Sequence, residues 1–274
     1  MEIAFYPAPG KLNLFLHVLG RRADGYHDLQ TVFRLVEQAD RIGISVREDG
    51  RISSNAQFEN DLCARAARTL QEKTGCKKGC DLVLEKNLPV GGGMGGGSSD
   101  AATVLMVLNR LWETGLGKQK LQEIALTLGA DVPFFIFGRN ALAEGVGERL
   151  TPLDLPAAWY LVLVPEVEVS TAAVFADNSL TRNTKPLKIP PFFAGQGAND
   201  LEAVVARRYP AVAAQLAWLK HRCPQARMTG SGACVFAEFR TEAEARALER
   251  ERPAALRAFV TRGLERHPLH DWTP

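Results

Sequence analysis

The sequence predicts an α+β protein built from two domains. At about 150 residues per domain, a chain of 274 residues forms one large domain or two modest ones. Strand-like patterns dominate its first third, and helical spacing begins near residue 100. A proline-containing segment, 151–156, then precedes a new apolar run. We therefore expect an N-terminal domain of residues 1–153 and a C-terminal domain of residues 154–274, which meet at a cleft.

The composition excludes several classes of protein. The longest apolar stretches, 132–137 and 159–164, are far shorter than the roughly 18–20 residues that cross a bilayer. The N-terminus lacks the basic segment of a signal peptide, so we expect a cytoplasmic protein without a membrane partner. With 33 basic and 31 acidic side chains, the net charge of +2 is too small to favour nucleic acid as a partner.

The five cysteines are odd in number and scattered, and no histidine stands at a metal-binding spacing from them. This pattern is typical of free thiols in a reducing compartment and disfavours a zinc site.

The first third of the chain carries four strand signals. Apolar-rich runs at 12–19 and 31–36 flank a polar loop, 20–28, whose Asp-Gly step favours a turn. Residues 42–46 alternate as a half-buried strand does, and 82–84 form a further short apolar run.

The pattern becomes helical after a glycine cluster. Apolar residues recur at helical spacing over 101–112, with Ser98 or Ser99 as the expected N-cap and Gly115 as the expected end. A second helix is expected at 121–128, closed by a glycine.

Mixed α and β patterns continue to the C-terminus. The expected elements are a helix capped by Asp131, a strand at 159–164, a short helix capped by Ser170 or Thr171, a helix over 201–219, a strand at 235–239 and a helix opened by a Thr241/Glu244 capping box.

The glycine cluster is the strongest functional signal. Six glycines occupy the seven positions 91–97, which is unfavourable for folding unless something approaches the backbone closely. Glycines that lead into a helix N-terminus expose N–H groups at the positive end of its dipole, so phosphate binding is favoured over a flexible linker.

Two familiar phosphate motifs fit poorly. Gly91, Gly93 and Gly96 satisfy G-x-G-x-x-G, but residues 86–90 separate them from the preceding strand, unlike a dinucleotide fingerprint. A Walker motif is excluded because no Lys-Ser or Lys-Thr follows the glycines. The Ser-Ser-Asp at 98–100 suits phosphate oxygens and hydrated Mg²⁺, which makes a nucleoside triphosphate the leading ligand.

Five motifs in order resemble a known superfamily. Residues 7–13 (PAPGKLN), 88–100 (LPVGGGMGGGSSD) and 228–234 (MTGSGAC) are similar to the three motifs of the GHMP kinases. Within that superfamily, residues 22–31 (RADGYHDLQT) and 128–134 (LGADVPF) resemble kinases that phosphorylate the 2-hydroxyl of a CDP-linked methylerythritol in non-mevalonate isoprenoid synthesis.

This resemblance implies a fold and its ligands. The expected architecture is an ATP-binding domain like domain 2 of ribosomal protein S5, followed by an α/β substrate domain, with the active site between them. ATP is the implied co-substrate with Mg²⁺, and the implied partner is the small molecule CDP-methylerythritol. The chain is expected to act as a monomer or a homodimer.

The resemblance assigns catalytic roles to Lys11 and Asp131. From local sequence alone, Lys11 is a strand-end lysine at the surface and Asp131 a helix N-cap. By resemblance, Lys11 orients the substrate hydroxyl and Asp131 is the base that aligns it with the γ-phosphate.

The implied ATP site is the segment around the glycine cluster: Lys86, Pro89, Val90, Gly91, Gly92, Gly93, Met94, Gly95, Gly96, Gly97, Ser98 and Ser99. Ser99 is a candidate contact to the metal of Mg-ATP. Related sequences usually read Asp-Asn-Leu where this chain reads Asn60-Asp61-Leu62, so either Asn60 or Asp61 could contact adenine.

The implied substrate site centres on aromatic residues. Tyr26 and His27 lie on the polar loop, where a surface aromatic is the plain alternative, and flat nucleobases stack on such rings. By resemblance, Tyr26, His27 and Phe175 hold the cytidine, together with Asn13 and Thr171.

Three other functions remain open at this point. The chain could be a GHMP kinase for mevalonate or homoserine, although the Gly-Tyr-His loop argues against it. It could be a nicotinamide-dependent oxidoreductase that uses the G-x-G-x-x-G subset, or a non-catalytic nucleotide-sensing or RNA-binding module.

Overall fold

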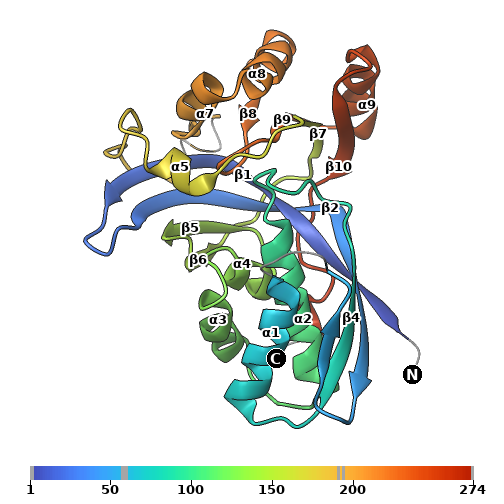
Figure 1. Ribbon diagram of the computed structural model, residues 1–274. Helices are drawn as coiled ribbons and strands as arrows, with labels where there is room; N and C mark the ends of the chain where they lie inside the picture. Colours follow the sequence, from blue (N-terminus) through green and yellow to red (C-terminus); the bar gives the residue numbers. More distant parts are fainter. Residues whose placement is uncertain (1–2, 57–60, 190–191, 193–194, 273–274) are drawn as a thin grey trace.

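The computed structural model describes residues 3–56, 61–189, 192 and 195–272. They form two β-sheets with helices packed on each (Figure 1). The elements in chain order are β1 (Ala4–Arg21), β2 (His27–Arg47), β3 (Ile52–Ser54), α1 (Leu62–Thr74), β4 (Gly79–Glu85), α2 (Gly96–Leu111), α3 (Lys118–Leu126), α4 (Val132–Phe137), β5 (Ala141–Gly145), β6 (Arg149–Pro152), β7 (Trp159–Val164), α5 (Thr171–Phe175), α7 (Glu202–Arg208), α8 (Pro210–Arg222), β8 (Arg227–Met228), β9 (Val235–Phe239), α9 (Glu242–Glu251), β10 (Arg257–Arg262) and the 3₁₀ turn η1 (His270–Trp272).

Each sheet carries its own hydrophobic core. The first sheet has the order β3-β4-β2-β5-β6 with β1 paired to β2, and its core includes residues of α1 to α4. The second has the order β10-β7-β9-β8, and its core includes residues of α7, α8 and α9. A third cluster, which includes Phe15, Val32, Tyr160 and Phe236, joins the two sheets. This is the α+β arrangement that the sequence predicts.

The long strands β1 and β2 extend from one half of the molecule into the other (Figure 1). Separate strands were expected at 31–36 and 42–46, but the structure has one strand there. The residues between them remain within β2: Ala39 and Asp40 pair with Pro9 and Ala8 of β1, and the register shifts between Pro9 and Lys11. Asp40 is fully buried and accepts the N–H groups of Asn87 and Leu88, so its polarity is satisfied inside the strand.

Most of the later elements follow the sequence pattern. The strand at 159–164, the strand at 235–239 and the Thr241/Glu244 capping box are confirmed. The single helix expected over 201–219 is wrong, because α7 ends before Tyr209 and Pro210 opens α8.

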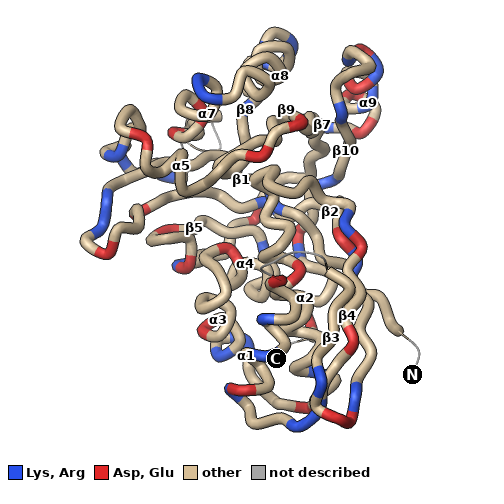
Figure 2. The backbone as a smooth tube through the Cα atoms, in the orientation of Figure 1, with Lys and Arg blue, Asp and Glu red and all other residues tan. Residues whose placement is uncertain are grey.

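The structure shows the state of the cysteines, the distribution of the charged residues and the nature of the helices. All five cysteines are free thiols. Basic and acidic residues are interspersed in both halves of the molecule (Figure 2). Within the described ranges, no helix is long and apolar enough to cross a membrane.

The C-terminal tail returns to the first core. Leu264, Leu269 and Trp272 pack against the cluster under the first sheet, and Trp272 stacks edge-on against Tyr6. The domain boundary at 153/154 stays a prediction, and this tail shows that the two halves share chain segments.

His267, in this tail, is expected to make stability depend on pH. It is 2% exposed, and burial, with a smaller effect of His270, lowers its pKa to about 3. Unfolding restores the ordinary pKa of 6.5, so the unfolded chain binds a proton that the folded chain does not. The free energy of unfolding should therefore fall by about 1.4 kcal/mol per pH unit as the pH drops below 6.5.

Urea unfolding at pH 7.5 and pH 5 would measure this effect in the wild type and in His267→Asn. Asparagine can still accept the hydrogen bond that Leu269 N donates to His267 Nδ1, but it does not titrate. Between pH 7.5 and pH 5, the free energy of unfolding should fall by at least about 1 kcal/mol less in the variant than in the wild type. An equal loss in both proteins would contradict this role of His267.

Candidate active site

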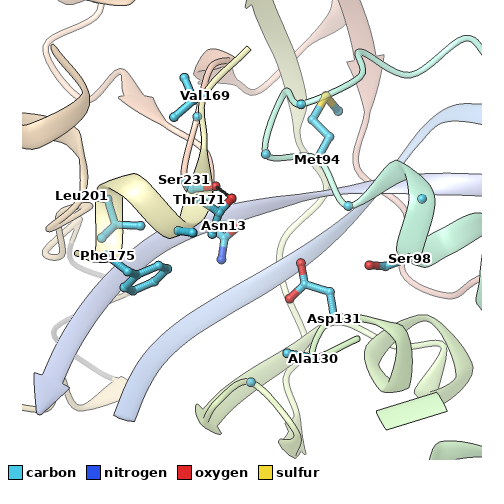
Figure 3. A pocket seen from close by; sticks show the side chains of 18 of the residues that line it. Asn13, Met94, Ser98, Ala130, Asp131, Val169, Thr171, Phe175, Leu201 and Ser231 are labelled. Carbon is cyan, nitrogen blue, oxygen red and sulfur yellow. Dashed lines mark hydrogen bonds between the residues drawn. The ribbon is translucent and has the colours of Figure 1, made fainter. Parts of the chain in front are cut away.

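The main cleft has a volume of about 1330 Å³ and lies where the two halves of the molecule meet. It is lined by parts of β1 and β2, the loop from Lys86 to Ser98, the start of α4, α5 and the turn 230–232. Figure 3 shows Asn13, Ser98 and Asp131 facing a common space, with Phe175 at one side. Of the site residues expected from sequence that the structure describes, all line this cleft except Ser99.

The glycine loop is held by backbone hydrogen bonds from remote segments. The N–H of Lys11 donates to the Met94 carbonyl at 2.9 Å. The N–H groups of Ala233 and Cys234 donate to the carbonyls of Gly91 and Gly92, both at 3.1 Å. The first, second and third motifs of the sequence therefore form one backbone assembly.

The glycines of this loop are needed for two different reasons. A Cβ on Gly93 would lie 2.2 Å from the Thr229 carbonyl oxygen, and a Cβ on Gly92 would lie 2.8 Å from Cys234 Sγ. A Cβ added to Gly91 or Gly97 would have its nearest neighbour at 3.6 or 3.4 Å, which is ordinary contact distance. From the sequence, we expected the glycines to be required because a ligand approaches their backbone closely. At Gly92 and Gly93 the close neighbour is the protein itself, while Gly91 and Gly97 are exposed toward the cleft.

Helix α2 begins earlier than expected. Gly95 is its N-cap, with φ of 70°, so the expectation of a serine cap at Ser98 or Ser99 is wrong. The glycine reaches this left-handed conformation without the strain that a side chain would bring. The positive end of a 16-residue helix thus meets the cleft at Gly96 and Gly97, which is a favourable place for an anion.

The two serines differ in where their hydroxyls go. Ser98 lines the cleft, and its side chain points toward Asp131 in Figure 3. Ser99 is fully buried, does not line the cleft and donates its hydroxyl to the Pro9 carbonyl at 2.7 Å. Ser99 therefore fastens α2 to β1, and Ser98 is the hydroxyl within reach of a ligand.

Lys11 and Asp131 meet in the cleft. Lys11 Nζ lies 3.4 Å from Asp131 Oδ2, and it also donates to Asn13 Oδ1 and lies 5.1 Å from the centre of the Phe33 ring. Lys11 is 3% exposed, so it is not the surface lysine of the plain alternative. The side chain of Asp131 is 34% exposed.

Asp131 stands at the N-cap position of α4, but its side chain makes no capping hydrogen bond. The expected capping role is therefore wrong. The carboxylate instead faces Lys11 and the cleft, where it is free to contact a ligand.

Asn13 links Lys11 to the third motif. Its backbone N–H donates to Thr229 Oγ1, and its side-chain Nδ2 donates to Thr31 Oγ1, both at 2.9 Å. Because Oδ1 accepts from Lys11 Nζ, the side-chain amide is fixed in orientation by hydrogen bonds at both its oxygen and its nitrogen.

Lys86, which the resemblance places in the ATP site, is paired with two carboxylates. Its ammonium is paired with Asp40 and lies 2.9 Å from Asp100 Oδ2, beneath the start of α2. Burial opposes the charged form of Lys86, but Asp100 and Asp40 outweigh it and raise the pKa of Lys86. Burial raises the pKa of Asp100; Lys86 opposes that shift and Asp40 adds to it. The charge of Lys86 is thus neutralised mainly by these carboxylates.

The far end of the cleft beyond Lys86 is lined by Asp61, Leu62, Cys63 and Leu84. Asp61 caps α1, because its Oδ1 accepts the N–H groups of Cys63 and Ala64 at 2.9 and 3.2 Å. Asn60 lies outside the described residues. Leu62, Cys63 and Leu84 were missed by the sequence reasoning, since each resembles an ordinary core residue.

The opposite end of the cleft holds the aromatic residues. The rings of His27 and Phe175 are stacked, with centroids 5.0 Å apart and planes 28° apart. Tyr26 is 62% exposed beside them. Thr171 Oγ1 lies 2.7 Å from Ser231 Oγ, which joins α5 to the third motif (Figure 3).

Arg182 and Ser231 also line this end and were not expected as site residues. Arg182 Nε donates to His27 Nε2 at 3.0 Å. No local pattern around Arg182 marks it, whereas the Gly-Ser-Gly turn at 230–232 was visible as a weak signal.

Comparison with known proteins defines the class first. Residues 61–139 match the GHMP kinases N terminal domain, and residues 192–258 match the GHMP kinases C terminal domain. The Methanococcus jannaschii mevalonate kinase has the same fold, with a TM-score of 0.65 at 12% identity over 96% of this chain and 99% of that one. The fold and the glycine loop are thus those of a GHMP kinase.

More similar proteins specify the branch. The 4-diphosphocytidyl-2-C-methyl-D-erythritol kinase of Thiobacillus denitrificans is 57% identical over 98% of both chains, and that of Nitrosospira multiformis is 56% identical over 97% of this chain and 93% of its own. A crystal structure of 4-(cytidine 5'-diphospho)-2C-methyl-D-erythritol kinase has a TM-score of 0.83 at 34% identity, covering 95% of this chain and all of that one. The chain belongs to the family of 4-diphosphocytidyl-2-C-methyl-D-erythritol kinases.

Proposed function

We propose that this protein transfers the γ-phosphoryl group of ATP to the 2-hydroxyl of 4-diphosphocytidyl-2-C-methyl-D-erythritol, a step of non-mevalonate isoprenoid synthesis. The observation that carries this proposal is the identity of more than 50% over nearly the full chain to kinases of that name. That similarity favours this substrate over mevalonate and homoserine, whose kinases are only 12–14% identical. The nicotinamide and non-catalytic alternatives have no such support.

The geometry suits phosphoryl transfer, which needs positioning and charge neutralisation rather than a covalent intermediate. We propose that the ATP phosphates lie against the glycine loop and the N-terminus of α2. The methylerythritol hydroxyl then lies between Lys11 and Asp131. Asp131 accepts the hydroxyl proton, the oxygen attacks the γ-phosphorus, and ADP leaves.

Lys11 has two tasks in this proposal. As a nearly buried cation 3.4 Å from Asp131, it holds the carboxylate in place beside the substrate hydroxyl. It also lies where it can neutralise charge on the transferred group. Asn13 keeps the ammonium in place, because its Oδ1 accepts a hydrogen bond from Lys11 Nζ.

Mg²⁺ fits the oxygen donors of this cleft. No group of three or more His, Cys, Asp or Glu among the described residues could hold a metal ion by itself. Mg²⁺ commonly binds through substrate phosphates with one or two protein oxygens, and the Ser98 hydroxyl and the Asp131 carboxylate are available for this. Bound there, the ion would neutralise charge on the phosphates.

The cytidine is proposed to bind at the aromatic end, against Tyr26, His27 and Phe175, with Thr171 nearby. A cytoplasmic location and a monomeric or homodimeric state stay predictions.

ADP formation with CDP-methylerythritol, mevalonate and homoserine, each offered alone with Mg-ATP, tests the function. We expect turnover with the first substrate only. No turnover with CDP-methylerythritol, or faster turnover with another acceptor, would overturn the proposal.

A further inference from the structure

Arg182 is a cation at the aromatic end of the cleft to which no role has been assigned. It lies in the loop after α5 and is partly buried. Its guanidinium donates to three backbone carbonyls, those of Leu180 at 3.1 Å, Phe175 at 2.7 Å and Asp177 at 2.9 Å. Its Nε–H donates to His27 Nε2 at 3.0 Å, across 155 positions of sequence.

This last hydrogen bond determines the tautomer of His27. A guanidinium has only donors, so the nitrogen that it contacts must be the acceptor of a neutral imidazole. The single ring proton of His27 then sits on Nδ1, and Nδ1–H is a donor. The surroundings favour the neutral ring: burial, then Arg182 and Arg21, lower the pKa of His27.

His27 lines the cleft, and no described group hydrogen-bonds to its Nδ1. Its ring is stacked on Phe175, whose carbonyl is also bound by Arg182. Arg182 thus holds both partners of the stack, one through its ring nitrogen and the other through its backbone.

We propose that Arg182 is a positioning residue for the pyrimidine base: it locks His27 as the Nδ1–H tautomer, which then donates to a ring acceptor of the cytosine, N3 or O2. This inference rests on the proposed function, because that function places the cytidine at this end. It adds a directed hydrogen bond to the stacking of the aromatic rings.

Long-range ¹H–¹⁵N spectra of the ¹⁵N-labelled full chain read the tautomer directly, with the His27 signals identified from their loss in His27→Gln. In the wild type we expect Nδ1 protonated and Nε2 unprotonated. In Arg182→Gln, whose amide can donate or accept, we expect a mixture of tautomers. A wild-type ring protonated on Nε2, or a variant with unchanged tautomers, would overturn the inference.

Kinetics supply the functional readout. Arg182→Gln should raise the KM for CDP-methylerythritol roughly fivefold or more, the usual effect of one lost hydrogen bond, with the KM for ATP within about twofold. Arg182→Lys keeps a donor-only group, so it should retain the wild-type tautomer and a KM closer to that of the wild type. An unchanged KM in Arg182→Gln, an equal rise of both KM values, or an equal loss in the two variants would contradict the proposed role.

Tyr26→Ala separates this inference from the function on which it rests. Tyr26 makes no contact with Arg182 among the described interactions, so this variant should raise the substrate KM without changing the tautomer of His27. If Tyr26→Ala raises the KM and Arg182→Gln does not, the base site stands and the role of Arg182 falls. If the wild type does not phosphorylate CDP-methylerythritol at all, the proposed function falls, and the spectra still report whether Arg182 holds His27.

Discussion

Replacing Asp131 with asparagine is expected to lower kcat at least about a hundredfold while the protein stays folded. Asparagine has nearly the same shape as aspartate but cannot accept the hydroxyl proton. Because the Asp131 side chain makes no capping hydrogen bond, its loss should leave α4 intact. Lys11 keeps its contacts with Asn13 and the Phe33 ring, and the new amide oxygen can still accept from it.

Steady-state kinetics and thermal unfolding of Asp131→Asn measure both parts of this expectation. The KM values for ATP and for the acceptor should change by no more than about threefold, because the lost interaction acts mainly in the transition state. Asp154→Asn is the matched control, since the Asp154 carboxylate is 98% exposed and lies outside the cleft. Near-normal turnover in Asp131→Asn would remove this residue from the role of base.

The second large effect is expected from Gly93→Ala. Gly93 has a φ of 75°, and an added Cβ would lie 2.2 Å from the Thr229 carbonyl oxygen and 3.0 Å from that of Gly232. Left-handed strain and overpacking together should destabilise the fold by roughly 3 kcal/mol. The glycine loop would separate from the 229–234 segment, so activity should be lost as well.

Gly97→Ala is the matched control in the same loop. Gly97 lies in the first turn of α2, and a Cβ added there would lie 3.4 Å from its nearest neighbour, Leu62 Cδ1. Alanine should leave the unfolding free energy unchanged or raise it by up to about 1 kcal/mol, since it favours the helix. The substitution should instead change the KM for ATP. Equal unfolding free energies for Gly93→Ala and Gly97→Ala in urea would contradict the packing role of Gly93.

Local patterns predicted much of the fold. The strands at 159–164 and 235–239 and the capping box at Thr241 depend on side chains within a few residues of one another, and the structure confirms them. Short strands such as β8 and β10 were not predicted. Their formation depends on pairing with β9 and β7 rather than on their own composition.

The candidate site was predicted in outline, and its details depended on contacts between remote segments. Asp131 looked like a helix cap, but Lys11, 120 positions earlier, draws the carboxylate toward the cleft. The resemblance assigned Lys86 to the ATP site, and only the structure shows that its ammonium pairs with Asp40 and Asp100. Arg182 had no signal at all, because its partner His27 is 155 residues away.

By itself, the sequence determined the class of chemistry. A glycine cluster before a helix, followed by Ser-Ser-Asp, indicates a phosphate site because backbone N–H groups and the helix dipole act over only a few residues. Only the tertiary structure decided which glycines serve packing, that Ser98 rather than Ser99 faces the cleft, and that Arg182 contacts His27. These depend on close approaches between segments that are distant in the chain, and such distances are set by the packing of the two sheets.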